Sequence, residues 1–463
     1  MRTKARRLLW LAMLLLVGAC QTPPAPLPEL VTLPAPAPTQ ALVLTATALP
    51  EWMRTPVTES PAELSPTPLP AWCEQLLSPA IPPLGVLRVA FVKDRDVWIW
   101  DENQTVQQLT HHGDVQQVYL SDDGQVLAYL RAGPNDTVDL WQIDSSGQEP
   151  RQAISAAGFD RMRTEPEQVG VIPFDLAWIP GTHRLAFNTY PLLPGEAIWI
   201  YVPDDLWVFD LDSLRTFTLF PKGQGGHFSF SPDGKLAAVF SPAGLKIMKA
   251  NGAILMEDAL EGFQALGLGD YYSYPSLQWA PDSQSLIVAI PSGQDPFQPQ
   301  AGAVIWRVPV DGSQPELVKE IPAYLAQVSF SPDLTRLAYF HQPDQRSSGR
   351  ELHLTELDGD EDFLFLRGEV MERFQWLPDS QHFLYWEIDA WLPQLAHICQ
   401  EAAEFPAFAV RSDIHWVDAT RFLFLSGGDG AWELNLGAID GTLTPIAELG
   451  ESYAFAFQVV GGE

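Results

Sequence analysis

The chain has 463 residues and a formal net charge of −31 at pH 7, from 27 Lys and Arg against 58 Asp and Glu. With no basic stretch after Arg7, it offers no electrostatic surface for nucleic acid, so we expect no nucleic-acid partner. Acidity of this degree keeps a protein soluble and disfavours flat docking on anionic lipid.

Residues 1–19 predict an export signal peptide. A basic start precedes an apolar run from Leu8 to Val17, and small residues follow before Cys20. The run is too short to cross a bilayer as a helix, so a transmembrane anchor is the weaker interpretation.

The tetrad Val17-Gly18-Ala19-Cys20 resembles the lipobox of bacterial lipoproteins. The resemblance implies cleavage before Cys20 and acylation of its thiol and new amino group, which would hold the protein at a membrane. Ordinary secretion with an incidental cysteine is the alternative. We therefore expect an extracytoplasmic protein, lipid-anchored through Cys20 to the bacterial cell membrane or outer membrane.

The next segment, residues 20–83, is crowded with Pro, Ala, Thr and Leu. Such a composition cannot pack a core and predicts a disordered or polyproline-like tether. The folded domain, residues 84–463, would then stand away from the membrane surface.

Two further cysteines remain after Cys20, namely Cys73 near the end of the tether and Cys399 in a late repeat. Disulfides persist in exported proteins, so we expect this pair to be bonded and to staple the incoming segment to the folded domain. Two free thiols are the alternative.

A repeated pattern then organises the rest of the chain: a large apolar residue, a turn and a short apolar run, as in FSPDGKLAAVF. Seven copies follow one another roughly 40–60 residues apart, which is typical of a β-propeller with four short strands per blade. The copies begin at Leu120, Trp178, Phe230, Trp279, Phe330, Trp376 and Trp416. In each, the first residue ends an inner strand and the apolar run forms the second strand.

The two ends of this region complement each other. Residues 87–110 supply three strands with no inner strand before them, and residues 452–460 supply an orphan strand. We expect the C-terminal strand to complete the N-terminal blade, which closes the ring and leaves no open edge. The predicted fold is an all-β propeller of eight four-stranded blades, with seven as the runner-up.

The aromatic-Ser-Pro-Asp-Gly turns, as at Phe230 to Gly234, resemble those of TolB-like and WD-repeat-like (PD-motif) propeller lipoproteins of the bacterial cell envelope. The resemblance spans residues 87–460 and implies the fold. TolB carries an α/β domain before its propeller, where this chain has a Pro-rich tether, so the partners of TolB are not implied.

Strand order places the short turns on one face of the ring and the longer connections on the other, where function usually resides. These connections carry aromatic residues suited to a peptide, glycan or protein partner. The candidates are Tyr190, Tyr201, Tyr271, Tyr272, Tyr274 and Trp391. Packing within their own loops is the alternative for each.

No motif for catalysis or metal binding is found, and we expect no catalytic residue, no metal and no cofactor. His397 with Cys399 is at most half a metal site. Asp358, Asp360 and Asp362 have the spacing of a calcium loop, but Phe363 occupies the position that needs glycine.

The function we expect is therefore that of a monomeric, non-catalytic binding or scaffold module for a protein, peptide or glycan. The alternative is a hydrolase or lyase acting on polysaccharide or peptide through carboxylates at the channel mouth. Asp204, Asp205 and Asp270 are the residues that would have to converge for such chemistry.

Overall fold

The computed structural model describes residues 70–74, 85–103, 106–165, 168–193, 203–242, 244–263, 266–268, 271–292, 302–324, 327–343, 350–368, 370–387, 392–406, 408–428 and 430–461, all within the unit Pro66–Glu463. The predicted signal peptide, Cys20 and the tether up to residue 69 lie outside them. No helix in these ranges has both the length and the hydrophobicity that crossing a bilayer requires.

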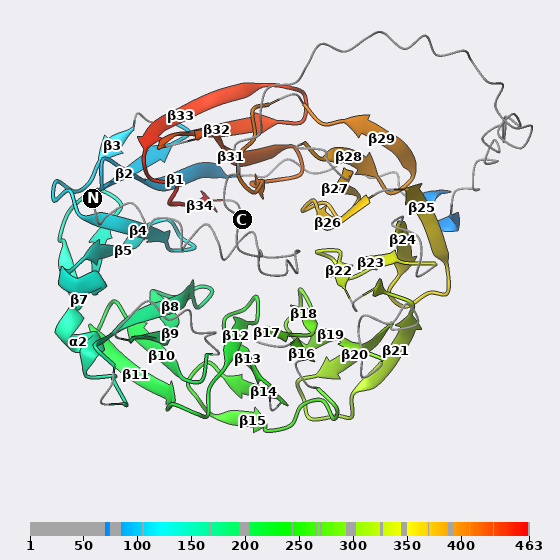
Figure 1. Cartoon of the computed structure of the whole chain (residues 1–463), viewed down its shortest axis with the longest axis horizontal. Helices are drawn as coiled ribbons and strands as arrows, with labels where there is room; N and C mark the ends of the chain where they lie inside the picture. Colours follow the sequence, from blue (N-terminus) through cyan, green and yellow to red (C-terminus); the bar gives the residue numbers. More distant parts are fainter. Residues whose placement is uncertain are drawn as a thin grey trace, which may run out of the picture. The chain divides into compact units, whose positions relative to one another are not determined.

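Eight four-stranded antiparallel sheets form the blades of a β-propeller (Figure 1), which confirms the predicted eight-bladed fold. We number the blades in ring order. Blade 1 contains β34 (Phe455–Val460), β1 (Val86–Lys93), β2 (Asp96–Asp101) and β3 (Gln107–Gln108). Blade 2 contains β4 (Val115–Leu120), β5 (Val126–Ala132), β6 (Val138–Asp144) and β7 (Arg151–Ile154).

The next three blades follow the same order from the innermost strand outward. Blade 3 contains β8 (Gly170–Trp178), β9 (Arg184–Leu192), β10 (Leu206–Asp210) and β11 (Arg215–Phe220). Blade 4 contains β12 (His227–Phe230), β13 (Leu236–Ser241), β14 (Gly244–Lys249) and β15 (Ile254–Met256). Blade 5 contains β18 (Ser276–Trp279), β19 (Ser285–Pro291), β20 (Ala303–Pro309) and β21 (Glu316–Ile321).

The last three blades complete the ring. Blade 6 contains β22 (Val328–Phe330), β23 (Arg336–His341), β24 (Arg350–Glu356) and β25 (Asp362–Gly368). Blade 7 contains β26 (Val370–Trp376), β27 (His382–Glu387), β28 (Gln394–His397) and β29 (Gln400–Glu404). Blade 8 contains β30 (His415–Trp416), β31 (Arg421–Gly428), β32 (Ala431–Ala438) and β33 (Leu443–Gly450).

A few short elements lie outside the blades or in their links. A separate hairpin, β16 (Leu266–Leu268) with β17 (Tyr271–Ser273), lies between blades 4 and 5 in the sequence. Among the described residues, the helical elements are η2 (Ala71–Glu74), η3 (Pro134–Asp136) and α2 (Ala156–Asp160). In α2, Ser155 caps the N-terminus and Phe159 is buried edge-on against Phe187.

The C-terminal strand closes the ring as the sequence predicts. β34 pairs antiparallel with β1, from Val86 opposite Val460 to Phe91 opposite Phe455. This pairing leaves β1, which is buried on both faces, without an unpaired edge.

The three turns between first and second strands that begin with serine, at Ser121, Ser231 and Ser331, share a hydrogen bond from the serine hydroxyl to the aspartate two residues later. In blade 4, Oγ of Ser231 donates to Asp233 at 2.7 Å and accepts the backbone N–H of Leu236 at 3.0 Å. Gly234 adopts φ +67°, and a Cβ at this position would lie 2.0 Å from the backbone oxygen of Pro180 in blade 3. The close approach of the neighbouring blade therefore requires glycine here, whereas the same turn position in other repeats holds Ser283, Leu334 and Ser380 at similar φ values.

Alternate residues of each strand pack against alternate neighbouring blades. In β23, Leu337 and Tyr339 join the core shared with blade 5, while Ala338 and Phe340 join the core shared with blade 7. This follows from the two-residue period of a strand, and it explains why the apolar runs in the repeats are nearly continuous.

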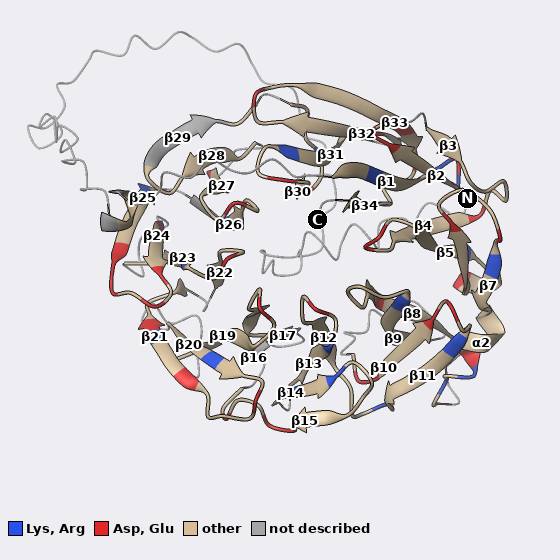
Figure 2. Cartoon of the chain, turned by 180° about the vertical axis from the view of Figure 1, so that it is seen from behind, with Lys and Arg blue, Asp and Glu red and all other residues tan. Residues whose placement is uncertain are grey.

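The two faces of the ring differ in their connections. The links from first to second strand are short and uniform: 121–125, 179–183, 231–235, 280–284, 331–335, 377–381 and 417–420. Figure 2 shows acidic residues in several of these turns. The links from second to third strand, and from fourth strand to the next blade, share the opposite face, which we call the long-link face. They include 155–169, 193–205, 257–275, 292–302, 342–349 and 405–414.

Candidate functional site: the long-link face

Two of the predicted aromatic residues have described side chains, and both pack against other rings. Tyr190, in β9, lies 6.1 Å from Phe174 between ring centroids. Tyr274 stands edge-on to His227 at 4.6 Å and to Phe240 at 5.6 Å. Both residues are partly exposed.

The other four candidates are not placed as side chains. Tyr271 and Tyr272 belong to β17, of which only the backbone pairing is described. Tyr201 and Trp391 lie outside the described residues, as does the predicted lipidation site Cys20. The six candidates are therefore not shown to converge on one site.

Cys73 and Cys399 are joined by a disulfide across 326 residues of sequence. Cys73 lies in η2, and the neighbouring Trp72 is buried in the core between blades 6 and 7. The guanidinium of Arg336 lies 5.6 Å from the Trp72 ring centre. The segment before the first blade is thus held to the propeller by a covalent bond and a buried aromatic side chain.

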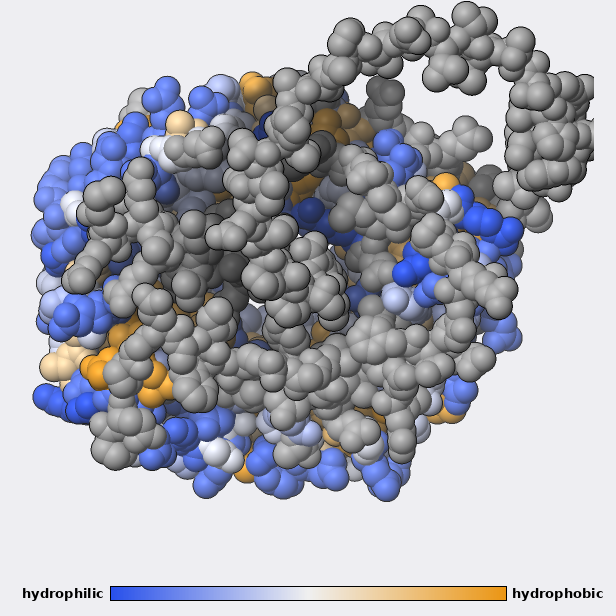
Figure 3. All heavy atoms as spheres, viewed as in Figure 1, coloured by the Kyte–Doolittle hydropathy of each residue, from blue (hydrophilic) through white to orange (hydrophobic). Residues whose placement is uncertain are grey.

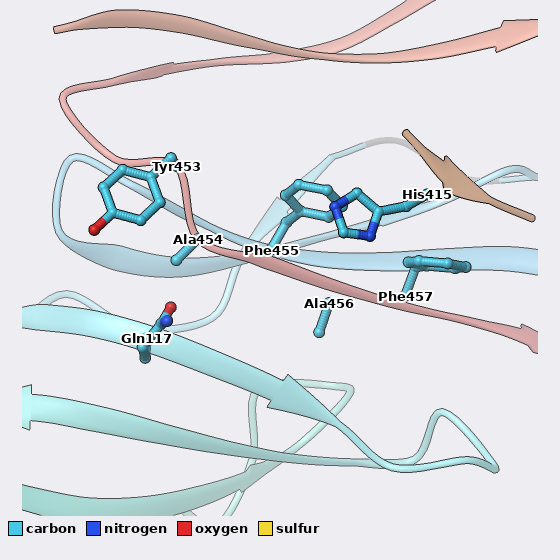
Figure 4. Close-up of a pocket in the computed structure, with 7 residues that line it drawn as sticks. All are labelled: Gln117, His415, Tyr453, Ala454, Phe455, Ala456 and Phe457. Atoms are coloured by element: carbon cyan, nitrogen blue, oxygen red, sulfur yellow. The ribbon is translucent and has the colours of Figure 1, made fainter. Parts of the chain in front are cut away.

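A pocket of about 310 Å³ lies where three successive inner strands begin at the long-link face (Figure 4). These strands are β30, β34 and β4, from blades 8, 1 and 2. The pocket is lined by Gln117, His415, Tyr453, Ala454, Phe455, Ala456 and Phe457. None of these residues is among the candidates predicted from the sequence.

The pocket has an aromatic side and a side of small residues. The His415 ring stands edge-on to Phe455 at 5.1 Å and to Phe457 at 6.5 Å. Ala454 and Ala456 belong to the opposite interface, with blade 2. Tyr453, which also lines the pocket, is 48% exposed.

No carboxylate, Lys or Arg is among the lining residues of this pocket. Burial lowers the pKa of His415, an effect that the nearby Asp413 only partly opposes. The imidazole is therefore neutral at pH 7, and the pocket presents uncharged aromatic and amide groups.

Of the three carboxylates predicted at the channel mouth, the structure describes Asp204 and Asp205. Asp205 is buried and accepts hydrogen bonds from the backbone N–H of Thr189 and from Nε1 of Trp207, each at 2.9 Å. Burial raises the pKa of the adjacent Asp204. Asp270 lies outside the described residues.

A second group at the long-link face combines two imidazoles with one buried carboxylate. His341 ends β23 and lies opposite Glu351 in β24, while His353 follows two residues later on the same side of that strand. Nδ1 of His341 lies 3.1 Å from Oε2 of Glu351, and Nε2 of His353 lies 3.4 Å from the same oxygen.

Charged neighbours surround this His–Glu–His cluster, by which we mean His341, Glu351 and His353. Burial acts to lower the pKa of His353, but the carboxylates of Asp362 and Glu351 outweigh it and raise that pKa overall. Burial likewise acts to raise the pKa of Glu351, and hydrogen bonds from the two imidazoles, with the charge of Arg367, lower it overall.

The other metal candidates weighed in the sequence are held in different contacts. Asp358 pairs with Arg307 at 2.6 Å, and Asp362 accepts from the Tyr339 hydroxyl at 3.0 Å. Nδ1 of His397 accepts the backbone N–H of Cys399. None of these contacts has the arrangement of a calcium loop or of a His–Cys metal site.

Both the pocket and the cluster have weak signals in the sequence. Phe455 and Phe457 alternate with alanines in the closing strand, and Glu351-x-His353 places two ligand-type side chains on one face of a strand.

Around the rim of the face seen in Figure 3, hydrophilic residues predominate among those described.

Comparisons with known proteins assign the chain to no family. No protein-family model matches the chain, and no curated protein matches it. A crystal structure of TolB from Acinetobacter baumannii is similar over 78% of this chain and 78% of its own, with 12% identity and a TM-score of 0.35. The β-propeller domain of the trilobed protease from Pyrococcus furiosus covers 73% of this chain and 98% of its own, with 15% identity and a TM-score of 0.42.

An oligogalacturonate lyase in complex with manganese is similar over 65% of this chain and 81% of its own, with 15% identity and a TM-score of 0.41. Solved propellers similar to this chain thus include both enzymes and TolB. Likeness at this level concerns the propeller architecture and carries no argument about activity, ligand or location.

Proposed function

We propose that this chain is a membrane-tethered, extracytoplasmic propeller that binds a protein, peptide or glycan and catalyses no reaction. The observation that carries the proposal is the uncharged aromatic pocket at the long-link face, formed by inner strands of three blades. Concave sites lined by aromatic rings with a few polar groups are the usual form of ligand sites in proteins.

The chemistry of the lining indicates what the pocket would hold. Tyr453, Phe455 and Phe457 offer ring faces and edges, and Gln117 offers an amide that donates and accepts hydrogen bonds. A sugar ring or an aromatic peptide side chain matches this combination of apolar surface and few polar contacts. The exposed Tyr453 is the residue best placed to anchor such a ligand.

The same lining is the reason to prefer binding over catalysis. Hydrolysis or elimination at a polysaccharide or peptide needs an acid and a base, or an activated nucleophile, within reach of the bound substrate. The pocket supplies one neutral imidazole and no carboxylate. Asp205 is occupied by structural hydrogen bonds.

The binding test compares the full chain, purified in detergent, with Tyr453→Ala on arrays of oligosaccharides and of peptides. A matched control is Phe217→Ala, because Phe217 is a similarly exposed aromatic residue on the outer strand β11 of blade 3. We expect Tyr453→Ala to weaken binding of an array ligand about tenfold or more, and Phe217→Ala to leave it unchanged. Equal affinities for all three proteins would place the ligand elsewhere.

The non-catalytic part of the proposal has its own test. Each array ligand that binds is incubated with the full chain, and its mass is followed over time. We expect no change of mass. If the full chain turns the ligand over, and Tyr453→Ala does so more slowly, the chain is a hydrolase or lyase and not a non-catalytic binding module.

The anchoring part rests on the sequence around Cys20. We expect the full chain to sediment with membranes and to incorporate labelled palmitate, and Cys20→Ala to do neither. Incorporation of label by Cys20→Ala would show that another residue is acylated or that the lipobox assignment is wrong.

A further inference from the structure

The His–Glu–His cluster in blade 6 is independent of the pocket and of the proposed binding function. Within the described ranges, it is the group of His, Cys, Asp and Glu side chains whose potential ligand atoms converge, all lying within 4.8 Å of one another. Antiparallel pairing of β23 and β24 produces it, because His341 lies opposite Glu351 and His353 lies opposite Tyr339.

The distances match the spacing of ligands around a small cation. Ligands at the usual bond lengths of tetrahedral zinc lie about 3.3 Å apart. In the cluster, Oε2 of Glu351 is 3.1 Å from Nδ1 of His341 and 3.4 Å from Nε2 of His353. Two edges of a coordination tetrahedron are therefore already formed.

Outer contacts orient the ligand atoms. Nδ1 of His353 lies 2.9 Å from Oδ2 of Asp362, a carboxylate that would accept the Nδ1 proton and leave Nε2, which faces Glu351, to bind an ion in place of its own proton. Arg367 binds the other carboxylate oxygen of Glu351, Oε1, at 2.6 Å, so that Oε2 remains directed at the imidazoles. Carboxylate–imidazole–metal arrangements of this kind are a regular feature of metal sites in proteins.

Packing further restricts the central imidazole. The Tyr339 ring stacks on His353 at 5.0 Å with an interplanar angle of 20°, and the Tyr339 hydroxyl donates to Asp362 at 3.0 Å. The same tyrosine is buried in the core between blades 5 and 6. His353 and Asp362 are thus held by the blade itself.

Accessibility differs among the three residues. The side chain of Glu351 is 7% exposed and that of His353 is 12% exposed, whereas that of His341 is 26% exposed. Solvent therefore reaches the cluster from the His341 side. Three protein ligands with one open side are the pattern of a site that keeps a position for water or for a further ligand.

We propose that His341, Glu351 and His353 bind one divalent transition-metal ion, with zinc preferred, through two imidazole nitrogens and one carboxylate oxygen. Nitrogen-rich donor sets favour zinc and related ions over calcium and magnesium, which take oxygen ligands. The alternative is a metal-free hydrogen-bond network among the same side chains. The metal site predicts that the chain retains an ion after dialysis, whereas the hydrogen-bond network predicts that it does not.

The test uses the full chain, stripped with chelator, loaded with zinc chloride and dialysed against excess calcium and magnesium. Those two ions displace zinc held only by the many surface carboxylates. We expect one zinc per chain by elemental analysis, a raised melting temperature on loading, and no retained zinc in His341→Gln.

A matched control comes from blade 7, where His382 lies 2.6 Å from Asp379 and its ring centre lies 4.8 Å from that of His397. This group also has two imidazoles and a carboxylate, but it is not among the convergent ligand sets of the described residues. We expect His382→Gln to retain zinc like the wild type. Loss of zinc in His382→Gln, or retention in His341→Gln, would overturn the assignment.

A second variant keeps the test decisive if His341→Gln folds poorly. Asp362→Asn retains the shape of a residue that orients His353 without binding the ion, and we expect it to weaken zinc about 10–100-fold. Unchanged affinity in this variant contradicts the proposed geometry. Absence of retained zinc in the wild type overturns the site. If the stripped chain is loaded instead with equal amounts of zinc and manganese chloride, retention of manganese in place of zinc overturns the preference for zinc.

Discussion

Nη1 of Arg421 lies 2.7 Å from Oε1 of Glu102, although 319 residues separate the two in the sequence. Arg421 begins β31 in blade 8, and Glu102 directly follows β2 in blade 1. Nε of the same arginine lies 2.6 Å from Asp418, so one guanidinium joins the turn of the last blade to the first blade. This ion pair reinforces the ring closure that β34 and β1 form.

The closing ion pair predicts a measurable loss of stability. We expect Arg421→Gln to lower the free energy of unfolding by about 1 kcal/mol, since partly buried charge networks exceed the small contribution of exposed pairs. Urea denaturation measures it. The control is Arg307→Gln, which breaks a more exposed pair with Asp358 between blades 5 and 6. A larger effect for Arg307→Gln would contradict the role of Arg421 in closure.

The disulfide predicts a dependence of stability on redox state. Reduction should lower the free energy of unfolding by about 2–4 kcal/mol, because the bond between Cys73 and Cys399 closes a long loop. Release of η2 would also expose Trp72 to water and shift its fluorescence to longer wavelength. The contribution of Trp72 is obtained by subtracting the spectrum of Trp72→Phe from that of the wild type. The double variant Cys73→Ser/Cys399→Ser should have the same free energy of unfolding as the reduced wild type, and reductant should not change it. If reduction leaves the free energy of unfolding of the wild type unchanged, the disulfide does not contribute to stability.

Hydrogen bonds between inner strands predict unequal effects of two similar substitutions. Nε1 of Trp376 donates to the backbone oxygen of Ser329 in the preceding blade at 2.9 Å. Trp416 occupies the corresponding repeat position in blade 8, and its buried Nε1 has no acceptor among the described residues. We expect Trp376→Phe to cost about 1 kcal/mol more than Trp416→Phe in thermal or urea unfolding. Equal costs would show that packing alone matters at these positions.

The repeated turns made the fold predictable from the sequence. A turn such as Ser331-Pro-Asp-Leu carries its own hydrogen bonds, because Ser331 donates to Asp333 within the same few residues. Ring closure was also predictable, since residues 87–110 lack an inner strand and residues 452–460 supply one. Both features depend on local patterns and on the rule that edges must be paired.

The two sites depend on contacts that no local pattern specifies. The pocket forms only after ring closure brings Gln117 and His415, from blades 2 and 8, to the two sides of β34. The cluster requires a register in which His341 faces Glu351 across the link 342–349. A shift of one residue would turn one of the two side chains to the opposite face.

His183 predicts a pH dependence of stability at the junction of blades 2 and 3. Its Nε2 lies 3.0 Å from Asp123 in the turn of blade 2, and its Nδ1 lies 3.1 Å from Asp212 in blade 3. Only the protonated imidazole donates to both carboxylates. Burial acts to lower the pKa of His183, but these two carboxylates raise it overall above its ordinary value of 6.5.

A raised folded-state pKa means that the contribution of His183 to stability is complete below the unfolded pKa and is lost as the pH rises through the folded value. We therefore expect the difference in unfolding free energy between wild type and His183→Gln to be largest at mildly acidic pH and to shrink through and above neutrality. Urea denaturation across this range measures the difference. The matched control is His111→Gln, which changes an exposed histidine in the link 109–114 and leaves the bridge from Asp123 to Asp212 intact. A difference that stays constant, or that grows as the pH rises, would show that the protonated imidazole does not bridge the two blades.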